Sequence, residues 1–345
     1  MTTNTIDREK PVILICGVDR AAEENHHLIA GAFMRSRART VNVRDIEFRS
    51  YLYVRKYVPR AKALLVHTSS AISLFGDQTE LKWIKIARRI DLPIFSVADT
   101  HFGWARPEVG SLAKSVKLFV ASPSEVAEAT TFGYESPEYI GGPPLWGSFR
   151  MQDGFYRPED KVFFVGGLKS PKITDEMLEV VVRGIRLVHG DDFGLIFRPH
   201  PKEDSSEDIK SRREAILLGV RQIPVGSSEL HDLARSEVSF FTSGATGVIA
   251  AGINRLPTAY YLSDSVDARM MKSIGRKDWT PVSEGATVTF RSPEDVKGIV
   301  DGFLNVNVSS SLRGAQAKVY PDGLGVGSAE RIVERILQEL QEIGA

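Results

Sequence analysis

The chain has 345 residues, of which 42% are hydrophobic and 26% are charged, and this length favours two domains over one. Lys and Arg together number 44, as do Asp and Glu, so the net charge of zero argues against a duplex-binding protein but leaves room for a local basic pocket. The single cysteine, Cys16, excludes a disulfide within the chain and fits a reducing compartment.

The N-terminal segment lacks the features of a targeting sequence. Its first eleven residues contain no apolar core of signal-peptide length. No stretch of the chain approaches about 18 uncharged apolar residues, the length of a transmembrane helix. We therefore expect a cytoplasmic protein without a transmembrane segment, and peripheral contact with a membrane surface stays open.

The first half alternates short apolar runs with longer segments of helical periodicity. The runs cover residues 11–17, 40–43, 63–68, 93–98, 117–121 and 138–141, and the helical segments cover 24–37 and 79–90. Nearly every position of each run is apolar, as in strands that are covered on both faces. This pattern predicts a parallel sheet with helices packed on it.

The second half repeats the scheme after a linker rich in Gly and Pro. The predicted strands are 161–165, 193–197, 221–225, 237–242 and 257–262, and the predicted helices are 174–188, 207–218, 228–235, 245–253 and 293–303. The linker, Gly141-Gly-Pro-Pro-Leu-Trp-Gly-Ser148, is typical of a hinge between domains. We predict an α/β protein with two Rossmann-like, doubly wound domains, residues 1–145 and 146–325, that face a cleft.

The C-terminal segment, 326–345, has the pattern of an amphipathic helix. One stripe is apolar and the opposite face is charged, with Ile332, Val333, Ile336, Leu337, Leu340 and Ile343 in the stripe. The stripe lasts only about two heptads, which favours packing back across the domain junction over a coiled-coil partner.

Arg198 and His200 follow the apolar run 193–197 within Arg-Pro-His-Pro. Ligands of open α/β sheets bind beyond the carboxyl ends of the strands, and the two prolines stiffen this loop. An arginine offers a planar fork to phosphate, and a histidine can donate to an anionic oxygen. The alternative is a structural turn in which Arg198 pairs with Glu203 or Asp204.

A second candidate loop opens the helix at 245–253. Its sequence is Thr242-Ser-Gly-Ala-Thr-Gly247, and glycines with free N–H groups at a helix start can hold an anion. The predicted phosphate-binding residues here are Thr242, Ser243, Gly244, Ala245 and Thr246. It lacks the Lys-Ser/Thr ending of a Walker loop, and an ordinary N-cap by Ser243 or Thr242 is the alternative.

In the first half, Asp99-Thr-His101 follows the run 93–98. Asp99 or His101 at a strand's carboxyl end could act as a general base toward a hydroxyl group. A capping aspartate beside a half-exposed histidine is the alternative. No sequence pattern of a zinc, calcium or other metal site is present, and we expect neither a metal nor a cofactor.

Together these features resemble the GT-B glycosyltransferase fold, and Ile140-Gly-Gly-Pro-Pro-Leu145 is similar to the crossover of many such enzymes. Within that group the chain resembles bacterial sialyltransferases, capsule Kdo-transferase-like proteins and CDP-glycerol transferases. The resemblance implies that His200-Pro201 and Thr242-Ser243-Gly244 address the phosphate of the nucleotide. It also makes Asp99 the base, although Asp-Thr-His-Phe-Gly departs from that group's usual acid-acid-Gly motif.

The resemblance implies a transferase of polysaccharide biosynthesis that moves a sugar or polyol-phosphate from a nucleotide-activated donor to a hydroxyl acceptor. UDP-sugar enzymes of this fold usually carry a glutamate in the helix after the Gly-rich loop, and residues 247–252 contain no acid. This absence favours a CMP- or CDP-linked donor. A nucleotide-sugar 2-epimerase or hydrolase and a non-catalytic nucleotide-binding scaffold are the alternatives.

Overall fold

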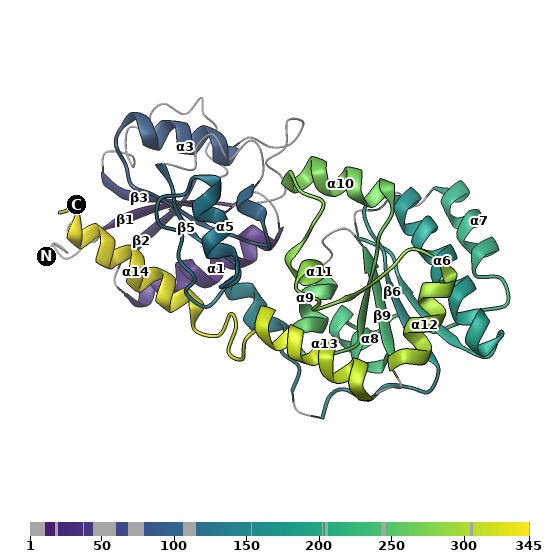
Figure 1. The fold of residues 1–345 in the computed structure, drawn as a ribbon. Coiled ribbons are helices and arrows are strands. Elements are labelled where there is room, and N and C mark those ends of the chain that lie inside the picture. Colours follow the sequence, from purple (N-terminus) through teal and green to yellow (C-terminus); the bar gives the residue numbers. More distant parts are fainter. Residues whose placement is uncertain are drawn as a thin grey trace, which may run out of the picture. The chain divides into compact units, whose positions relative to one another are not determined.

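A computed structural model describes residues 11–17, 20–36, 38–43, 60–67, 79–105, 115–152, 154–201, 203, 206–242, 246–303 and 306–344. Contacts divide the chain into two compact units (Figure 1). The N-terminal unit comprises Met1–Ser148, Ser273–Gly275 and Gly323–Ala345, and the C-terminal unit comprises Phe149–Lys272 and Arg276–Asp322.

The N-terminal unit is built on a five-stranded parallel sheet in the order β2-β1-β3-β4-β5. Its strands are β1 (Val12–Cys16), β2 (Arg39–Asn42), β3 (Ala61–His67), β4 (Ile94–Val97) and β5 (Lys117–Phe119). Its helices are α1 (Arg20–Arg35), α3 (Thr79–Arg89), α5 (Glu125–Phe132) and α14 (Ser328–Glu342), with short 3-10 turns at Gly103–Ala105 and Pro144–Phe149. The central strands are buried on both faces, as their apolar sequences predict.

Helix α14 belongs to the core of this unit. Its apolar stripe enters the same cluster as residues of α1 and β1, with Ile332, Val333, Ile336 and Leu340 packed beside Ile13, Ile29 and Phe33. Arg335 of α14 also forms an ion pair with Glu138, 2.8 Å apart. The amphipathic pattern is therefore explained by packing against the N-terminal sheet and α1.

The Gly-Pro segment after β5 is tied to the N-terminal unit. Gly325 N–H donates to the carbonyl of Gly141, and Leu145 N–H donates to the Asn25 side chain at 2.8 Å. A Cβ atom at Gly142 would lie 2.5 Å from the side chain of Leu324, and φ there is +76°. Glycine is needed because the backbone both adopts a left-handed conformation and touches its neighbours.

The C-terminal unit contains a six-stranded parallel sheet in the order β11-β10-β9-β6-β7-β8. Its strands are β6 (Val162–Gly166), β7 (Gly194–Arg198), β8 (Arg221–Gln222), β9 (Val238–Thr242), β10 (Thr258–Tyr261) and β11 (Val288–Phe290). Its helices are α6 (Pro171–His189), α7 (Glu207–Ile216), α8 (Glu229–Arg235), α9 (Thr246–Ile253), α10 (Asp264–Ile274), α11 (Thr280–Ser283), α12 (Pro293–Phe303) and α13 (Val306–Val319). Helices α7 and α12 pack on α6, whereas α8 and α13 pack on α9.

The order of this sheet reverses direction between β6 and β9, as in dinucleotide-binding Rossmann domains. The predicted class, two doubly wound α/β domains, is confirmed. The predicted strand at 138–141 is wrong: only a single bridge between Phe119 and Glu138 forms there. Helices α10, α11 and α13 and strand β11 were not predicted, because their short or mixed sequences carry weak periodicity.

None of the helices in the described part of the chain is long and apolar enough to cross a membrane.

Acid should destabilise the fold through His26 of α1. Burial, and to a smaller extent the charge of the neighbouring His27, lowers the pKa of His26 from 6.5 to about 4. The unfolded chain binds a proton below about pH 6.5 while folded His26 stays neutral, so stability is lost as pH falls from 6.5 toward 4. The full shift corresponds to about 3 kcal/mol.

The measurement is urea unfolding between pH 4 and 8. His26→Gln should flatten the acid limb of the stability profile, whereas His27→Gln, at an exposed position one residue on, should leave most of it in place. If the free energy of unfolding fell with acid as steeply in His26→Gln as in the wild type, the assignment to His26 would be contradicted.

Candidate functional site

Two loops meet at the carboxyl ends of β6 and β7 in the C-terminal unit. Gly167, just after β6, donates its N–H to the carbonyl of Arg198 at 2.7 Å. A Cβ atom at Gly167 would lie 2.9 Å from the Cα of Pro199 and 3.0 Å from the backbone nitrogen of His200. The Gly166–Gly167 turn therefore supports the Arg-Pro-His loop by direct backbone contact, which only glycine allows.

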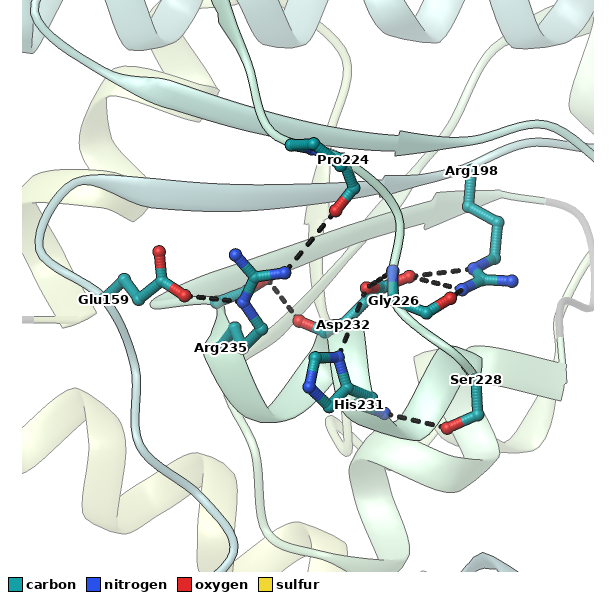
Figure 2. Close-up of polar contacts among 9 residues, drawn as sticks. Glu159, Arg198, Pro224, Gly226, Ser228, His231, Asp232 and Arg235 are labelled. Carbon is teal, nitrogen blue, oxygen red and sulfur yellow. Dashed lines mark hydrogen bonds and ion pairs between the residues drawn. The ribbon is translucent and has the colours of Figure 1, made fainter.

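The guanidinium of Arg198 is bound to the protein (Figure 2). Its Nε and Nη2 atoms both donate to Oδ2 of Asp232 in α8, at 2.9 and 2.6 Å, and Nη2 also donates to the carbonyl of Gly226. Asp232 therefore occupies one edge of the planar fork, and phosphate binding by Arg198 stays a prediction. The predicted alternative, a pairing with Glu203, is wrong, because Glu203 pairs with Arg213.

His200 lies in the same loop and is half-buried. Its backbone carbonyl accepts from Glu203 N–H at 2.9 Å, which closes a turn after Pro201. The stiff loop therefore holds His200 at the carboxyl end of β7, where the sequence places it. Asp204 lies outside the described residues.

Helix α8 is fixed at both of its ends. Ser228 caps its start by accepting from His231 N–H at 3.2 Å. At the other end Arg235 donates to Glu159 at 2.5 Å and to the carbonyl of Pro224 (Figure 2). These contacts at the two ends of α8 hold the buried Asp232 in place.

Glu229, the first residue of α8, lies against the first turn of α9. A Cβ atom at Gly247 would be 2.6 Å from Oε1 of Glu229 and 2.2 Å from the ring of Phe241. Burial raises the pKa of Glu229, while the nearby charge of Arg198 lowers it and that of Asp232 raises it. A carboxyl group thus lies beside the predicted phosphate loop.

The predicted loop after β9 is only partly described. Thr242 is buried, and its hydroxyl donates to the carbonyl of Tyr261 at 3.3 Å, so it supports β10 and does not cap α9. Ser243, Gly244 and Ala245 lie outside the described residues, and Thr246 begins α9. Their role in phosphate binding stays a prediction.

In the N-terminal unit, the loop after β4 is organised by a buried carboxylate. Glu125 of α5 accepts from Trp104 Nε1 at 2.8 Å and from the backbone N–H of Phe102, and it lies 2.5 Å from Nδ1 of His101. His101 is fully buried and contacts the ring of Trp146, so the alternative of a half-exposed histidine is wrong, and a general base at His101 or Asp99 stays a prediction. Asp99, two residues before His101, is 8% exposed.

Sequence reasoning missed Asp232, Glu229, Glu125 and the Gly166–Gly167 turn. The turn carried a usable signal, since two glycines follow a buried apolar strand and precede a helix that begins at Pro171. Within the described residues, no group of three His, Cys, Asp or Glu side chains is arranged to hold a metal ion.

No protein-family model matches the chain, and none of the curated proteins matches its sequence. Solved structures share its fold over nearly the whole length. S. aureus MnaA, determined with UDP, has a TM-score of 0.63 at 15% identity, covering 96% of this chain and 97% of that one. A UDP-GlcNAc 2-epimerase from Methanocaldococcus jannaschii has a TM-score of 0.58 at 15% identity, covering 95% and 99%.

A glycosyltransferase from Rickettsia africae is similar as well, with a TM-score of 0.57 at 8% identity, covering 96% of this chain and 99% of that one. The fold is therefore that of GT-B glycosyltransferases and UDP-GlcNAc 2-epimerases. The TM-scores establish the shared fold, and at identities this low the reaction is a matter for proposal.

Gly167→Ala should destabilise the C-terminal unit, because its new methyl group would meet the backbone of Pro199 and His200. We expect a loss of about 1–3 kcal/mol in urea unfolding. Gly298→Ala in α12 is the matched control, since nothing lies within 4 Å of a Cβ atom there. That change should be neutral or stabilise by about 0.5–1 kcal/mol, because alanine favours the helix. Equal effects of the two substitutions would refute the packing argument.

Proposed function

We propose that the protein is a glycosyltransferase that moves a sugar or polyol-phosphate from a nucleotide-activated donor to a hydroxyl acceptor. The observation that carries the proposal is the loop after β7, which is supported from the β6–β9 switch point. Gly167, just after β6, packs on the backbone of Arg198-Pro199-His200, and β6 lies beside β9, the strand that leads to α9. Rossmann folds bind nucleotides at this position. The fold neighbours support the proposal, because one was determined with UDP and another with UDP-glucose.

In this proposal the donor phosphate lies against the start of α9 and His200. Ser243, Gly244, Ala245 and Thr246 provide N–H and hydroxyl donors, and His200 donates to the leaving phosphate. The bond between the transferred group and the leaving phosphate breaks as the acceptor oxygen forms a bond to the transferred group. Asp99 stays the proposed base that takes the acceptor's proton. The reaction as proposed requires no metal.

The donor is proposed to be CMP- or CDP-linked. Helix α9 has the sequence TGVIAAGI and therefore carries no carboxylate of its own. By resemblance to sialyltransferases, Kdo transferases and CDP-glycerol transferases, this pattern favours a cytidine nucleotide over UDP. The same resemblance places the reaction in polysaccharide biosynthesis.

A nucleotide-sugar 2-epimerase is the second candidate. The fold neighbours favour it, since epimerases from Methanocaldococcus jannaschii and Neisseria meningitidis are among them, the latter bound to UDP-GlcNAc. An epimerase or hydrolase converts its donor with no acceptor present, whereas a transferase needs one. Analysis of products formed from donor alone therefore separates the two reactions.

A thermal-shift panel of CMP, CDP, UMP, UDP, GDP and ADP would identify the nucleobase of the donor. A ligand at 100 times its dissociation constant adds about 2.7 kcal/mol of stability, so binding should raise the melting temperature measurably. We expect the largest shifts with CMP or CDP. If UDP gave the largest shift, the cytidine assignment would fail and the epimerase would gain support.

His200→Ala should lower turnover about 100-fold or more while the fold is retained, because one preorganised donor to the leaving group is lost. Steady-state kinetics with the donor found in the panel would measure the loss, and circular dichroism would check the fold. His27→Ala, at an exposed position of α1, is the control and should keep full activity. A folded His200→Ala enzyme with unchanged turnover would exclude this role.

A further inference from the structure

Arg198 can offer a ligand one nitrogen only. Its Nε and Nη2 atoms are taken by Asp232 and by the carbonyl of Gly226, whereas Nη1 has no hydrogen-bond partner among the described residues. Figure 2 shows this third nitrogen turned away from Asp232. The side chain is 28% exposed, so Nη1 is the part of the guanidinium that a ligand can reach.

Asp232 is the group that fixes this orientation. Its side chain is fully buried, with Oδ2 accepting both bonds from Arg198 and Oδ1 accepting from the Gly226 backbone N–H at 2.6 Å. One carboxylate therefore joins the loop after β7 to the segment before α8. Charge-assisted pairs of this geometry are strong, and removing one buried partner leaves the other uncompensated.

The same contacts cancel the charge of Arg198. The guanidinium contributes +1 and Asp232 contributes −1 at a separation of 2.6 Å, so the pair is neutral as a unit. Glu229, one helical turn before Asp232, interacts with both of them and adds no positive charge. His231 lies 3.8 Å from Asp232, and Arg235 of the same helix also interacts with Asp232 while its own charge is paired with Glu159. Such a cluster attracts a phosphate dianion weakly.

We propose that Asp232 is a positioning residue that converts Arg198 from a phosphate clamp into a directional donor for an uncharged oxygen of the ligand. Nη1 would donate to a hydroxyl or carbonyl oxygen of the nucleoside, and the phosphate would rely on α9 and His200. This inference rests on the proposed function, because it names which part of that donor Arg198 contacts.

The decisive measurement uses calorimetry. It compares the binding of inorganic pyrophosphate with the binding of the nucleoside whose nucleotide gives the largest thermal shift. Asp232→Asn keeps the shape of the side chain but removes its charge, so the guanidinium charge is no longer cancelled. We expect pyrophosphate to bind roughly tenfold more tightly to this variant, with a steeper dependence on salt. Unchanged or weaker pyrophosphate binding would overturn the inference.

The double variant Arg198→Gln with Asp232→Asn is neutral, like the native pair. Its pyrophosphate affinity should stay within about twofold of wild type. It should lose about tenfold in affinity for the nucleoside and equally for the nucleoside diphosphate, because one hydrogen bond to an uncharged oxygen is missing. A loss confined to the diphosphate would make Arg198 a phosphate ligand and overturn the inference.

Asp175→Asn is the matched control, because Asp175 forms a comparable ion pair with Arg213 at 2.8 Å in the same unit. It should lose stability without changing the affinity for either ligand. Circular dichroism of each variant would confirm that it folds.

A spectroscopic readout separates failure of the inference from failure of the proposed function. In nitrogen-edited NMR, the Nε proton of Arg198 should exchange slowly with water in the wild type and rapidly in Asp232→Asn. If that signature appears but no nucleotide binds the wild type, the proposed function fails while the positioning role of Asp232 stands. If nucleotides bind but Arg198 exchanges rapidly in the wild type, the positioning role fails while the function stands.

Discussion

Within each described sheet the strands are parallel to one another, and this sets where chemistry is possible in that unit. Parallel strands are joined by helices on the faces, so the central strands are apolar at most positions. Polar side chains that could meet a ligand therefore collect at the edges where these strands end. The loops after β4, β6, β7 and β9 are such places.

Each of these edges depends on a carboxylate that is itself buried. Asp232 holds the Arg198 loop in the C-terminal unit, and Glu125 holds the segment from His101 to Trp104 in the N-terminal unit. In both units the acid comes from a helix, and the loop that it fixes follows a strand. A loop held in this way loses little further entropy when a ligand binds, which favours affinity.

The sequence predicts the fold well because continuous apolar runs such as Val12–Cys16 and Val238–Thr242 carry their own signal. It also places Arg198 and His200 at the carboxyl end of a strand. It could not show that Arg198 is neutralised, because Asp232 lies 34 residues away and pairing at that separation depends on how α8 packs. The burial of His101 was hidden for the same reason, since Glu125 comes from a different element.

The position of α14 has a consequence for biosynthesis. Ile332, Ile336 and Leu340 complete the core of the N-terminal unit, yet they leave the ribosome only after the whole C-terminal unit has been made. The first sheet to be synthesised must therefore wait, with an apolar face uncovered, until the last helix arrives. During translation the C-terminal unit can finish folding before the N-terminal one, and a chain shortened ahead of Ser328 would lose the stability of its opposite end.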